Sequence, residues 1–166
     1  MILVYRKLLH GLEQVLKVLI AVFLFAMVII ATVEVFRRYV LGLSFVWADE
    51  LVRFAMVWMT FLGGAYGYRK KELISFDFLQ NAIPEKFKAL GQLVITLIGL
   101  VFVAFIFKIG LEFSLSDVSV GQESMCMRIS MVFVYISIPV GMGAMILFML
   151  DDIISFFKRD KKGGTL

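Results

Sequence analysis

The hydrophobic residues of this chain fall into four long runs, separated by short segments that hold most of the charges. A helix needs about 20 apolar residues to cross a bilayer. None of the runs shows the strict alternation of apolar and polar positions that membrane strands require. The pattern therefore predicts an all-α integral membrane protein that forms one four-helix domain, residues 1–166, with transmembrane helices near residues 15–36, 45–68, 89–111 and 129–150.

Two segments next to these runs mix apolar and charged residues. Residues 1–18 place leucines at helical spacing against Lys7, Glu13 and Lys17, and residues 69–88 alternate apolar with charged positions. Helical segments of this kind lie in the membrane–water interface. We therefore expect both to be short amphipathic segments on the inner surface of the membrane.

The basic residues are distributed unevenly between the two sides of this four-helix topology. The amino-terminal segment, the loop at residues 69–88 and the carboxy-terminal tail together hold twelve of the 17 Lys and Arg residues. Because basic loops stay on the cytoplasmic side, both termini are predicted to be cytoplasmic. The net charge of +4 is then explained by the orientation of the chain in the membrane. Nucleic-acid binding would need a soluble basic face, which this sequence lacks.

Composition narrows the function classes further. The chain is 61% hydrophobic and 18% charged, with a mean hydropathy of +0.96. One cysteine, Cys126, excludes an intramolecular disulfide, and one histidine, His10, excludes a haem or metal site that needs two imidazoles from this chain. The sequence contains no phosphate-binding loop, zinc motif or Ser/His/Asp set. We therefore predict no catalytic residue, no cofactor and no bound metal, and neither an enzyme nor a haem-bearing redox anchor.

Six charged residues lie at the outer ends of the first two predicted helices, where charge is costly. They are three carboxylates and three guanidinium groups: Glu34, Arg37, Arg38, Asp49, Glu50 and Arg53. Their spacing of three or four residues places them on shared helix faces. Since a charge inside the membrane costs about 2.5–3.5 kcal/mol, we expect the set to pair across the hairpin or to face a partner. An ion or proton pathway is the alternative interpretation.

Small residues and a proline mark predicted helix contacts. Gly63 and Gly67, with Gly64 between them, form a small-xxx-small pattern that lets another helix approach closely. Pro139 is expected to kink the last helix, and a broken transporter helix would carry the same signal. Trp47 is predicted to be an interfacial anchor.

The stretch from Glu34 to Phe78 also resembles a known family. The resemblance rests on the order and spacing of Arg38-Tyr39, Trp47, Glu50-Leu51, Trp58, Gly63-Gly64, Arg69–Lys71, Ile74 and Asp77, together with VYISIPVG at residues 134–141. These features resemble the small membrane subunit, or DctQ-like family, of the tripartite ATP-independent periplasmic (TRAP) transporters.

This resemblance implies a four-helix subunit of the bacterial inner membrane that pairs with a large permease subunit and works with a periplasmic substrate-binding protein. In such systems the large subunit carries out sodium-driven uptake of organic acids, such as sialic acid or C4-dicarboxylates. The small subunit braces it, and the costly charges then lie against that partner or against membrane lipids.

Two functions therefore stay open. The first is a non-catalytic scaffold subunit of a secondary transporter. The alternative is a small self-assembling proton-coupled efflux protein, with Glu34 as the coupling carboxylate. The neighbouring Arg37 and Arg38 favour the ionised form of Glu34, which suits it poorly to binding and releasing protons.

Overall fold

The structure is a computed structural model that describes residues 2–71 and 88–162 of the chain. Within those ranges the backbone is helical except for short connections. The helices are α1 (Ile2–Phe36), the π-helical turn η1 (Arg37–Leu41), α2 (Val46–Lys70), α4 (Lys88–Ser114), α5 (Asp117–Gly121), α6 (Val132–Tyr135) and α7 (Ser137–Lys162). The β pairing of the described residues is one isolated bridge between Glu123 and Ser130.

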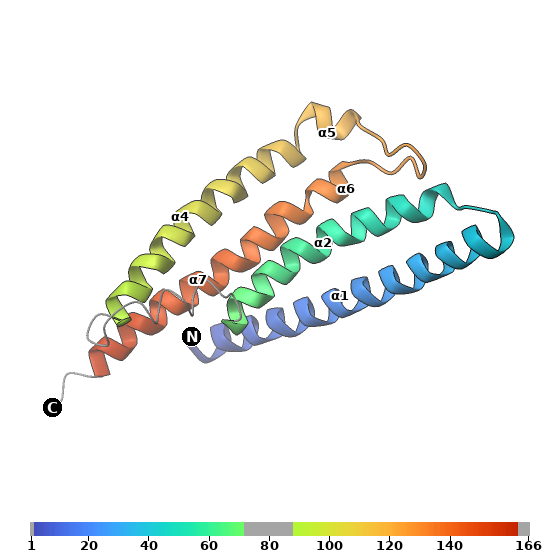
Figure 1. Cartoon of the computed structure of the whole chain (residues 1–166). Helices are drawn as coiled ribbons and strands as arrows, with labels where there is room; N and C mark the ends of the chain where they lie inside the picture. Colours follow the sequence, from blue (N-terminus) through green and yellow to red (C-terminus); the bar gives the residue numbers. More distant parts are fainter. Residues whose placement is uncertain (1, 72–87, 163–166) are drawn as a thin grey trace.

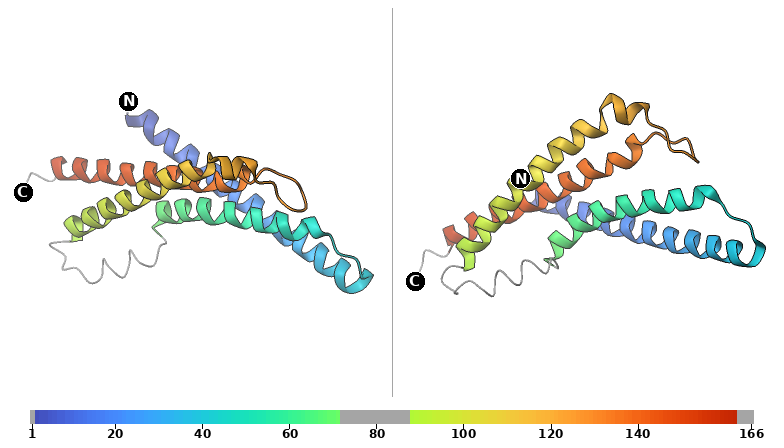
Figure 2. Two further views of the ribbon diagram at one scale, coloured as in Figure 1. Left: turned by 90° about the horizontal axis from the view of Figure 1, so that it is seen from above. Right: turned by 45° about the horizontal axis from the view of Figure 1, so that its top comes forward.

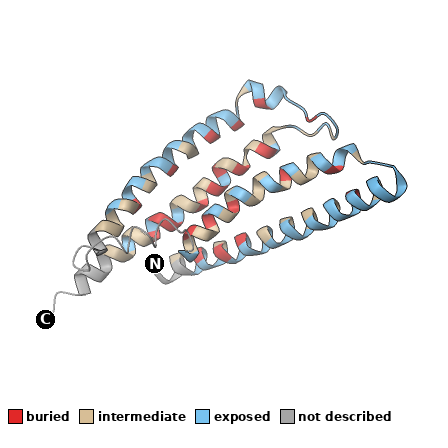
Figure 3. Ribbon diagram, viewed as in Figure 1, coloured by how far each residue is buried: buried red, intermediate tan, exposed pale blue. Residues whose placement is uncertain are grey.

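The four long helices lie in an open row. Helix α4 packs on α7, α7 packs on α2, and α2 packs on α1, whereas α1 and α4 do not touch within the described residues (Figure 1). Seen from above, α1 crosses the other helices obliquely (Figure 2). Because the row does not close into a bundle, buried residues concentrate on the contacts between neighbouring helices and the outer faces stay exposed (Figure 3). The fold is therefore an open layer of helices, in which the start of α1 also contacts α7.

Three helical segments of the described chain are long and apolar enough to cross a membrane: Lys7–Leu41, Gly91–Ser114 and Val132–Phe156. They confirm the predicted all-helical class with three candidate membrane spans. Helix α2 spans 25 residues but is not among them. Its two ends carry Asp49, Glu50, Arg53, Arg69 and Lys70. The crossing predicted for residues 45–68 thus stays a prediction, although the helix itself is present.

The first predicted amphipathic segment is not a separate element. Helix α1 runs unbroken over 35 residues, which at 1.5 Å per residue is about 52 Å. No proline interrupts residues 2–36, and Leu9 and Leu16 are buried in the core shared with α2 and α7. The prediction of a separate amphipathic segment at residues 1–18 was wrong, because this apolar stripe continues the packed face of one helix. The second segment falls largely on residues 72–87, outside the described residues.

Pro139 interrupts the last helix, as its position predicts. A proline has no N–H to give to the carbonyl four residues earlier, and here that carbonyl belongs to Tyr135, where α6 ends. Helix α7 starts at Ser137, whose hydroxyl donates to the Val134 carbonyl at 2.6 Å. The predicted start at residue 129 was three residues early, because residues 122–131 form a tight loop held by the Ser124 N–H on the Ile129 carbonyl and the Met131 N–H on the Gln122 carbonyl.

Two glycines allow the close packing of the row. A Cβ at Gly141 of α7 would lie 2.7 Å from the Phe61 carbonyl oxygen of α2, and a Cβ at Gly110 of α4 would lie 2.7 Å from Ile138 Cγ2. Real Cβ contacts are longer than this, so both positions require glycine. In contrast, Gly63 and Gly64 have nothing within 4 Å of a Cβ. A side chain at Gly63 or Gly64 would therefore meet no other helix of the described residues.

Candidate functional site

The main polar site joins three helices at the end of the layer where α1 begins and α2 ends. We call it the arginine cluster and define it as Glu13, Arg69, Lys70 and Asp151. Arg69 Nη1 lies 2.8 Å from Asp151 Oδ2, and Arg69 Nε lies 3.7 Å from Glu13 Oε2. Lys70 Nζ lies 2.5 Å from Glu13 Oε1. Glu13 is 9% and Asp151 is 7% exposed, so α2 supplies the cations that neutralise a buried carboxylate on each neighbouring helix.

Neighbouring groups extend this cluster across the layer. The Tyr68 hydroxyl donates to Asp152 Oδ2 at 3.1 Å, and Asp152 lines a cavity of about 160 Å³ together with the buried Thr96 of α4. The guanidinium carbon of Arg69 lies 5.4 Å from the centre of the Phe148 ring, a distance at which a cation is attracted to an aromatic face. All four long helices therefore have polar groups at this end.

Sequence reasoning missed the arginine cluster. It assigned Arg69 and Lys70 to the orientation signal, Glu13 to an interfacial segment and Asp151 to the end of a span. The available signal was the predicted topology itself, which puts all four side chains on one side of the membrane with opposite charges. What the sequence lacked was the neighbour relation between α1, α2 and α7.

At the opposite end, Glu34 closes the connection between α1 and α2. Its carboxylate accepts the Ser44 hydroxyl at 2.5 Å and the Phe45 N–H at 3.0 and 3.1 Å. Gly42 has a φ of 65°, which lets the chain reverse after the π-helical turn. Arg37 stacks over the Phe45 ring at 3.5 Å. Glu34, 6% exposed, is thus held by the loop that follows it.

Glu50 has a comparable role at the loop before α6. Its Oε2 accepts the Cys126 N–H at 3.2 Å and the Met127 N–H at 3.1 Å. These donors belong to the loop of residues 122–131, so one carboxylate on α2 holds a segment 76 residues away in sequence. The loop itself was not predicted as a binding partner of Glu50, because backbone donors leave no signal in a sequence.

The pairing across the hairpin that was one expectation for the six charges is absent from the described residues, while the alternative contact with a partner stays a prediction. The described residues contain no ion pair among Glu34, Arg37, Arg38, Asp49, Glu50 and Arg53. The structural reason is that Glu34 and Glu50 bind the N–H groups of loops, which satisfies each carboxylate without a cation. Arg38, Asp49 and Arg53 are exposed.

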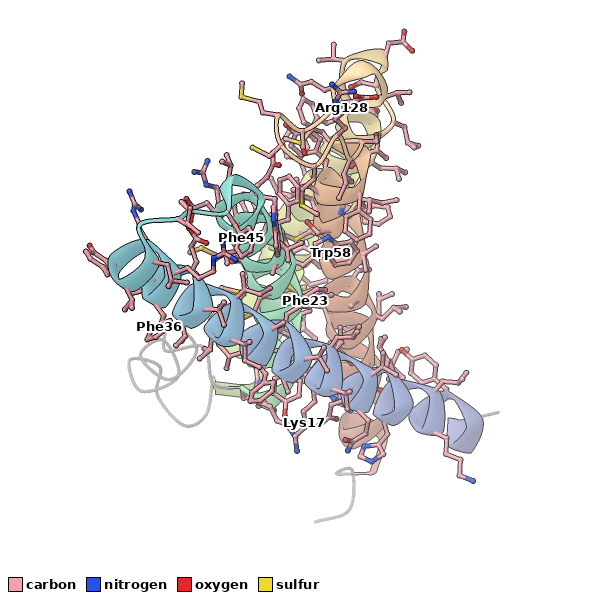
Figure 4. All side chains as sticks on the ribbon, turned by 90° about the vertical axis from the view of Figure 1, so that its right-hand side faces the viewer. Lys17, Phe23, Phe36, Phe45, Trp58 and Arg128 are labelled. Atoms are coloured by element: carbon pink, nitrogen blue, oxygen red, sulfur yellow. The ribbon has the colours of Figure 1, made fainter. Side chains whose placement is uncertain are left out.

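Two tryptophans and one glycine of the predicted set also make defined contacts. Trp47 is 42% exposed, with its ring 5.2 Å from that of Phe45. Trp58 stacks on Phe23 with 6.2 Å between ring centres and donates to the Phe133 carbonyl at 3.1 Å (Figure 4). The Gly67 carbonyl accepts the N–H of Lys71, which caps α2.

The chemistry within reach of these groups is that of binding and assembly. Residues 2–71 and 88–162 contain no cluster of three or more His, Cys, Asp or Glu side chains suited to a metal ion. Their polar clusters lie at the two ends of the layer. Each of the carboxylates Glu13, Glu34, Glu50 and Asp151 is engaged with a helix or loop of the chain itself.

Comparison with known proteins gives a consistent set of relatives. A family model described as "Tripartite ATP-independent periplasmic transporters, DctQ component" matches residues 27–159. The C4-dicarboxylate TRAP transporter small permease protein DctQ of Rhodobacter capsulatus is 31% identical over 104 residues, which are 63% of this chain and 46% of that protein. The sialic acid TRAP transporter small permease protein SiaQ of Vibrio cholerae is 24% identical over 153 residues, 92% of this chain and 86% of that protein.

A third relative is longer. The isethionate TRAP transporter permease protein DctMQ of Oleidesulfovibrio alaskensis is 22% identical over 135 residues, 77% of this chain and 21% of that protein. The chain therefore spans less than half the length of the C4-dicarboxylate and isethionate relatives, and most of the length of the sialic acid relative.

Proposed function

Because the chain belongs to the DctQ component family of the tripartite ATP-independent periplasmic transporters, we propose that it is the non-catalytic small permease subunit of such a transporter. In this role it is a scaffold for a large permease subunit, which carries out sodium-coupled uptake of an organic acid. A periplasmic binding protein delivers that acid. The names of the relatives, which refer to C4-dicarboxylate, sialic acid and isethionate, favour an anionic cargo.

The observation that carries this proposal is the open layer. A helix row whose outer members do not meet encloses no passage among the described residues, and its apolar side chains are exposed on α1 and α4, as at Phe25, Val28, Val101 and Phe102. Apolar faces of this kind suit a subunit that packs flat against another membrane protein and against lipid.

The same arrangement supports a membrane topology with four crossings. Helix α2 lies between α1 and α7, both of which include candidate spans, so we propose that it crosses the membrane beside them. Helix α1 begins and α7 ends at the same end of the layer (Figure 1). With the basic residues gathered there, we place that end in the cytoplasm of a bacterial inner membrane.

The face of α2 that carries Gly63 and Gly64 is the proposed contact for the partner. Both glycines face open space, and a helix of another subunit can approach a backbone closely at such positions. Arg53, exposed on the same helix, is the proposed polar contact. The assignment of the charged residues to assembly is part of the same proposal.

Co-purification and uptake assays test the scaffold role. The large permease subunit is purified in mild detergent with the wild-type chain, with Gly63→Leu or with Arg53→Ala, and is reconstituted with the binding protein. We expect both variants to reduce recovery of the complex while the substrate affinity of the assembled fraction stays unchanged. Lys108→Ala is the matched control, because Lys108 lies on α4 and pairs with its exposed neighbour Glu112 at 3.7 Å.

Two results would reject the proposal. One is equal stability and equal uptake of the large subunit with and without this chain. The other is solute transport by this chain alone in liposomes, which would favour the self-assembling efflux protein. The engagement of Glu34 by Ser44 and Phe45 weighs against that alternative, since hydrogen bonds to the ionised carboxylate disfavour its protonation. If Arg53→Ala assembled normally but shifted the sodium dependence of uptake, a pathway role would replace the structural one.

A further inference from the structure

A groove runs along the contact between α1 and α2 and ends at their connecting loop. Its inner section is a cavity of about 170 Å³ lined by apolar side chains of both helices, including Ala26, Ala55 and Trp58, and by Ile129 and Phe133 from the loop before α6 and from α6. Its outer section is a cavity of about 200 Å³. Ile30 and Val52 line both cavities, so the two are adjacent along the groove. Phe23 and Trp58 mark the inner section where the helices cross (Figure 4).

The outer section carries opposite charges that the chain does not pair. Arg38 and Asp49 both line it, both are exposed, and the described residues contain no ion pair between them. Glu34 lines the same cavity, but its carboxylate is engaged with Ser44 and Phe45. The mouth of the groove thus offers one guanidinium and one carboxylate above an entirely apolar interior.

We propose that this groove binds one phospholipid with a primary ammonium headgroup, of the phosphatidylethanolamine type. One acyl chain lies in the apolar inner section, the phosphate pairs with Arg38, and the ammonium pairs with Asp49. A guanidinium is well suited to phosphate, and an ammonium has three N–H groups to give to a carboxylate. Phosphatidylglycerol would present to Asp49 a neutral glycerol with no positive charge, and a choline headgroup has no N–H to donate.

The lining and the length of the groove suit an acyl chain. The side chains around the inner cavity are aliphatic or aromatic. Trp58 lies nine residues beyond Asp49 on α2, which is about 13 Å at 1.5 Å per residue. The groove therefore extends from headgroup depth to acyl-chain depth. The inference requires that the chain lie in a membrane, and it does not depend on the scaffold role.

Fluorescence quenching by brominated lipids tests the site. The full-length chain with Trp47→Phe keeps Trp58 as its one tryptophan, since the sequence has two. In phosphatidylcholine vesicles, the quencher is phosphatidylethanolamine, phosphatidylcholine or phosphatidylglycerol brominated in the acyl chains. We expect brominated phosphatidylethanolamine to quench Trp58 with about threefold higher apparent affinity than the other two, as one or two surface-exposed ion pairs allow.

Variants at the mouth and in the interior separate the headgroup contacts from the acyl-chain contact. Arg38→Gln and Asp49→Asn should each abolish the preference, whereas Arg38→Lys, which keeps the charge, should retain most of it. Ala55→Leu should reduce quenching by all three lipids because it fills the inner section. Val101→Phe, which adds bulk to an exposed position of α4, is the matched control and should change nothing. Circular dichroism confirms that each variant is folded.

Three results would overturn the inference. Equal quenching by the three lipids would show that Trp58 senses only bulk lipid. A preference for phosphatidylglycerol, or one that survives Arg38→Gln, would remove the proposed headgroup contacts. Loss of all quenching when the large permease subunit is added would show that the partner fills the groove. Complex recovery is measured separately, so the scaffold role stands or falls independently of these outcomes.

Discussion

The two ends of the helix layer use buried carboxylates in different ways. At the end where α2 finishes, Glu13 and Asp151 lie against Lys70 and Arg69, and the contacts join one helix to the next. At the end with the connecting loops, Glu34 and Glu50 accept N–H groups of loops. The first arrangement fixes how α1, α2 and α7 lie against each other. The second fixes where the chain reverses.

This difference follows from the hydrogen-bond donors and cations that are available at each end. Helices leave their last carbonyls and first N–H groups without internal partners, and a loop adds further unpaired N–H groups that a carboxylate can bind. Side chains in the middle of α1 and α7 meet no free backbone donors, so a buried carboxylate there needs a cation from a neighbouring helix. Replacing one group at a time therefore separates helix docking from loop closure.

The largest effect is expected from Arg69→Ala. It leaves Asp151 without its cation and removes one of the two main cations near Glu13, and breaking such a buried pair costs about 3 kcal/mol. The free energy of unfolding in mixed micelles measures the loss. Lys108→Ala, which breaks an exposed pair on α4, should cost less than about 0.5 kcal/mol. Equal effects of the two substitutions would mean that the arginine cluster contributes no helix docking.

Gly141→Ala tests helix docking without touching a charge. The added methyl group would lie 2.7 Å from the Phe61 carbonyl oxygen, so α2 and α7 must separate, at a cost of about 2 kcal/mol. In Gly63→Ala the methyl group meets open space. The free energy of unfolding should therefore increase by up to about 1 kcal/mol, because alanine has the higher helix propensity. A Gly141→Ala chain as stable as wild type would contradict the close approach of these helices.

Glu34→Ala is expected to open the first connecting loop without separating the helices. It removes the acceptor of the Ser44 hydroxyl and the Phe45 N–H, and hydrogen bonds to a charged group are stronger than those between neutral groups. Amide hydrogen exchange should accelerate at Phe45 and stay unchanged at the core residue Leu62. Unchanged protection at Phe45 would show that the loop is held by other contacts.

The smallest effect is expected from Glu50→Gln. The amide oxygen still accepts from Cys126 and Met127, but without the charge each bond is weaker. Reaction of the exposed Cys126 thiol with a maleimide should become faster as the loop loosens, while Asp117→Asn, in the neighbouring α5, leaves the rate unchanged. If Glu50→Gln leaves the reaction rate unchanged, this carboxylate does not hold the loop in place.

The sequence by itself determined the helical class, the approximate limits of the long helices and the break near Pro139. Long apolar runs and a missing N–H act locally, so their consequences do not depend on which helices become neighbours. The resemblance to the DctQ-like family, carried by residues between Glu34 and Gly141, also agreed with the family match over residues 27–159. The unbroken start of α1 was missed because a polar stripe facing solvent and one facing another helix look alike in sequence.

The tertiary structure alone decided the partners of the charged groups. Spacing along one helix suggested pairs among residues 34–53, yet Glu34 and Glu50 bind loop N–H groups, and the ion pairs form among Glu13, Arg69, Lys70 and Asp151. It also decided that Gly141 and Gly110 meet a neighbouring helix while Gly63 and Gly64 do not. The physical reason is that a contact between distant segments depends on which helix faces lie together, and the order of helices in a row is a property of the packed layer.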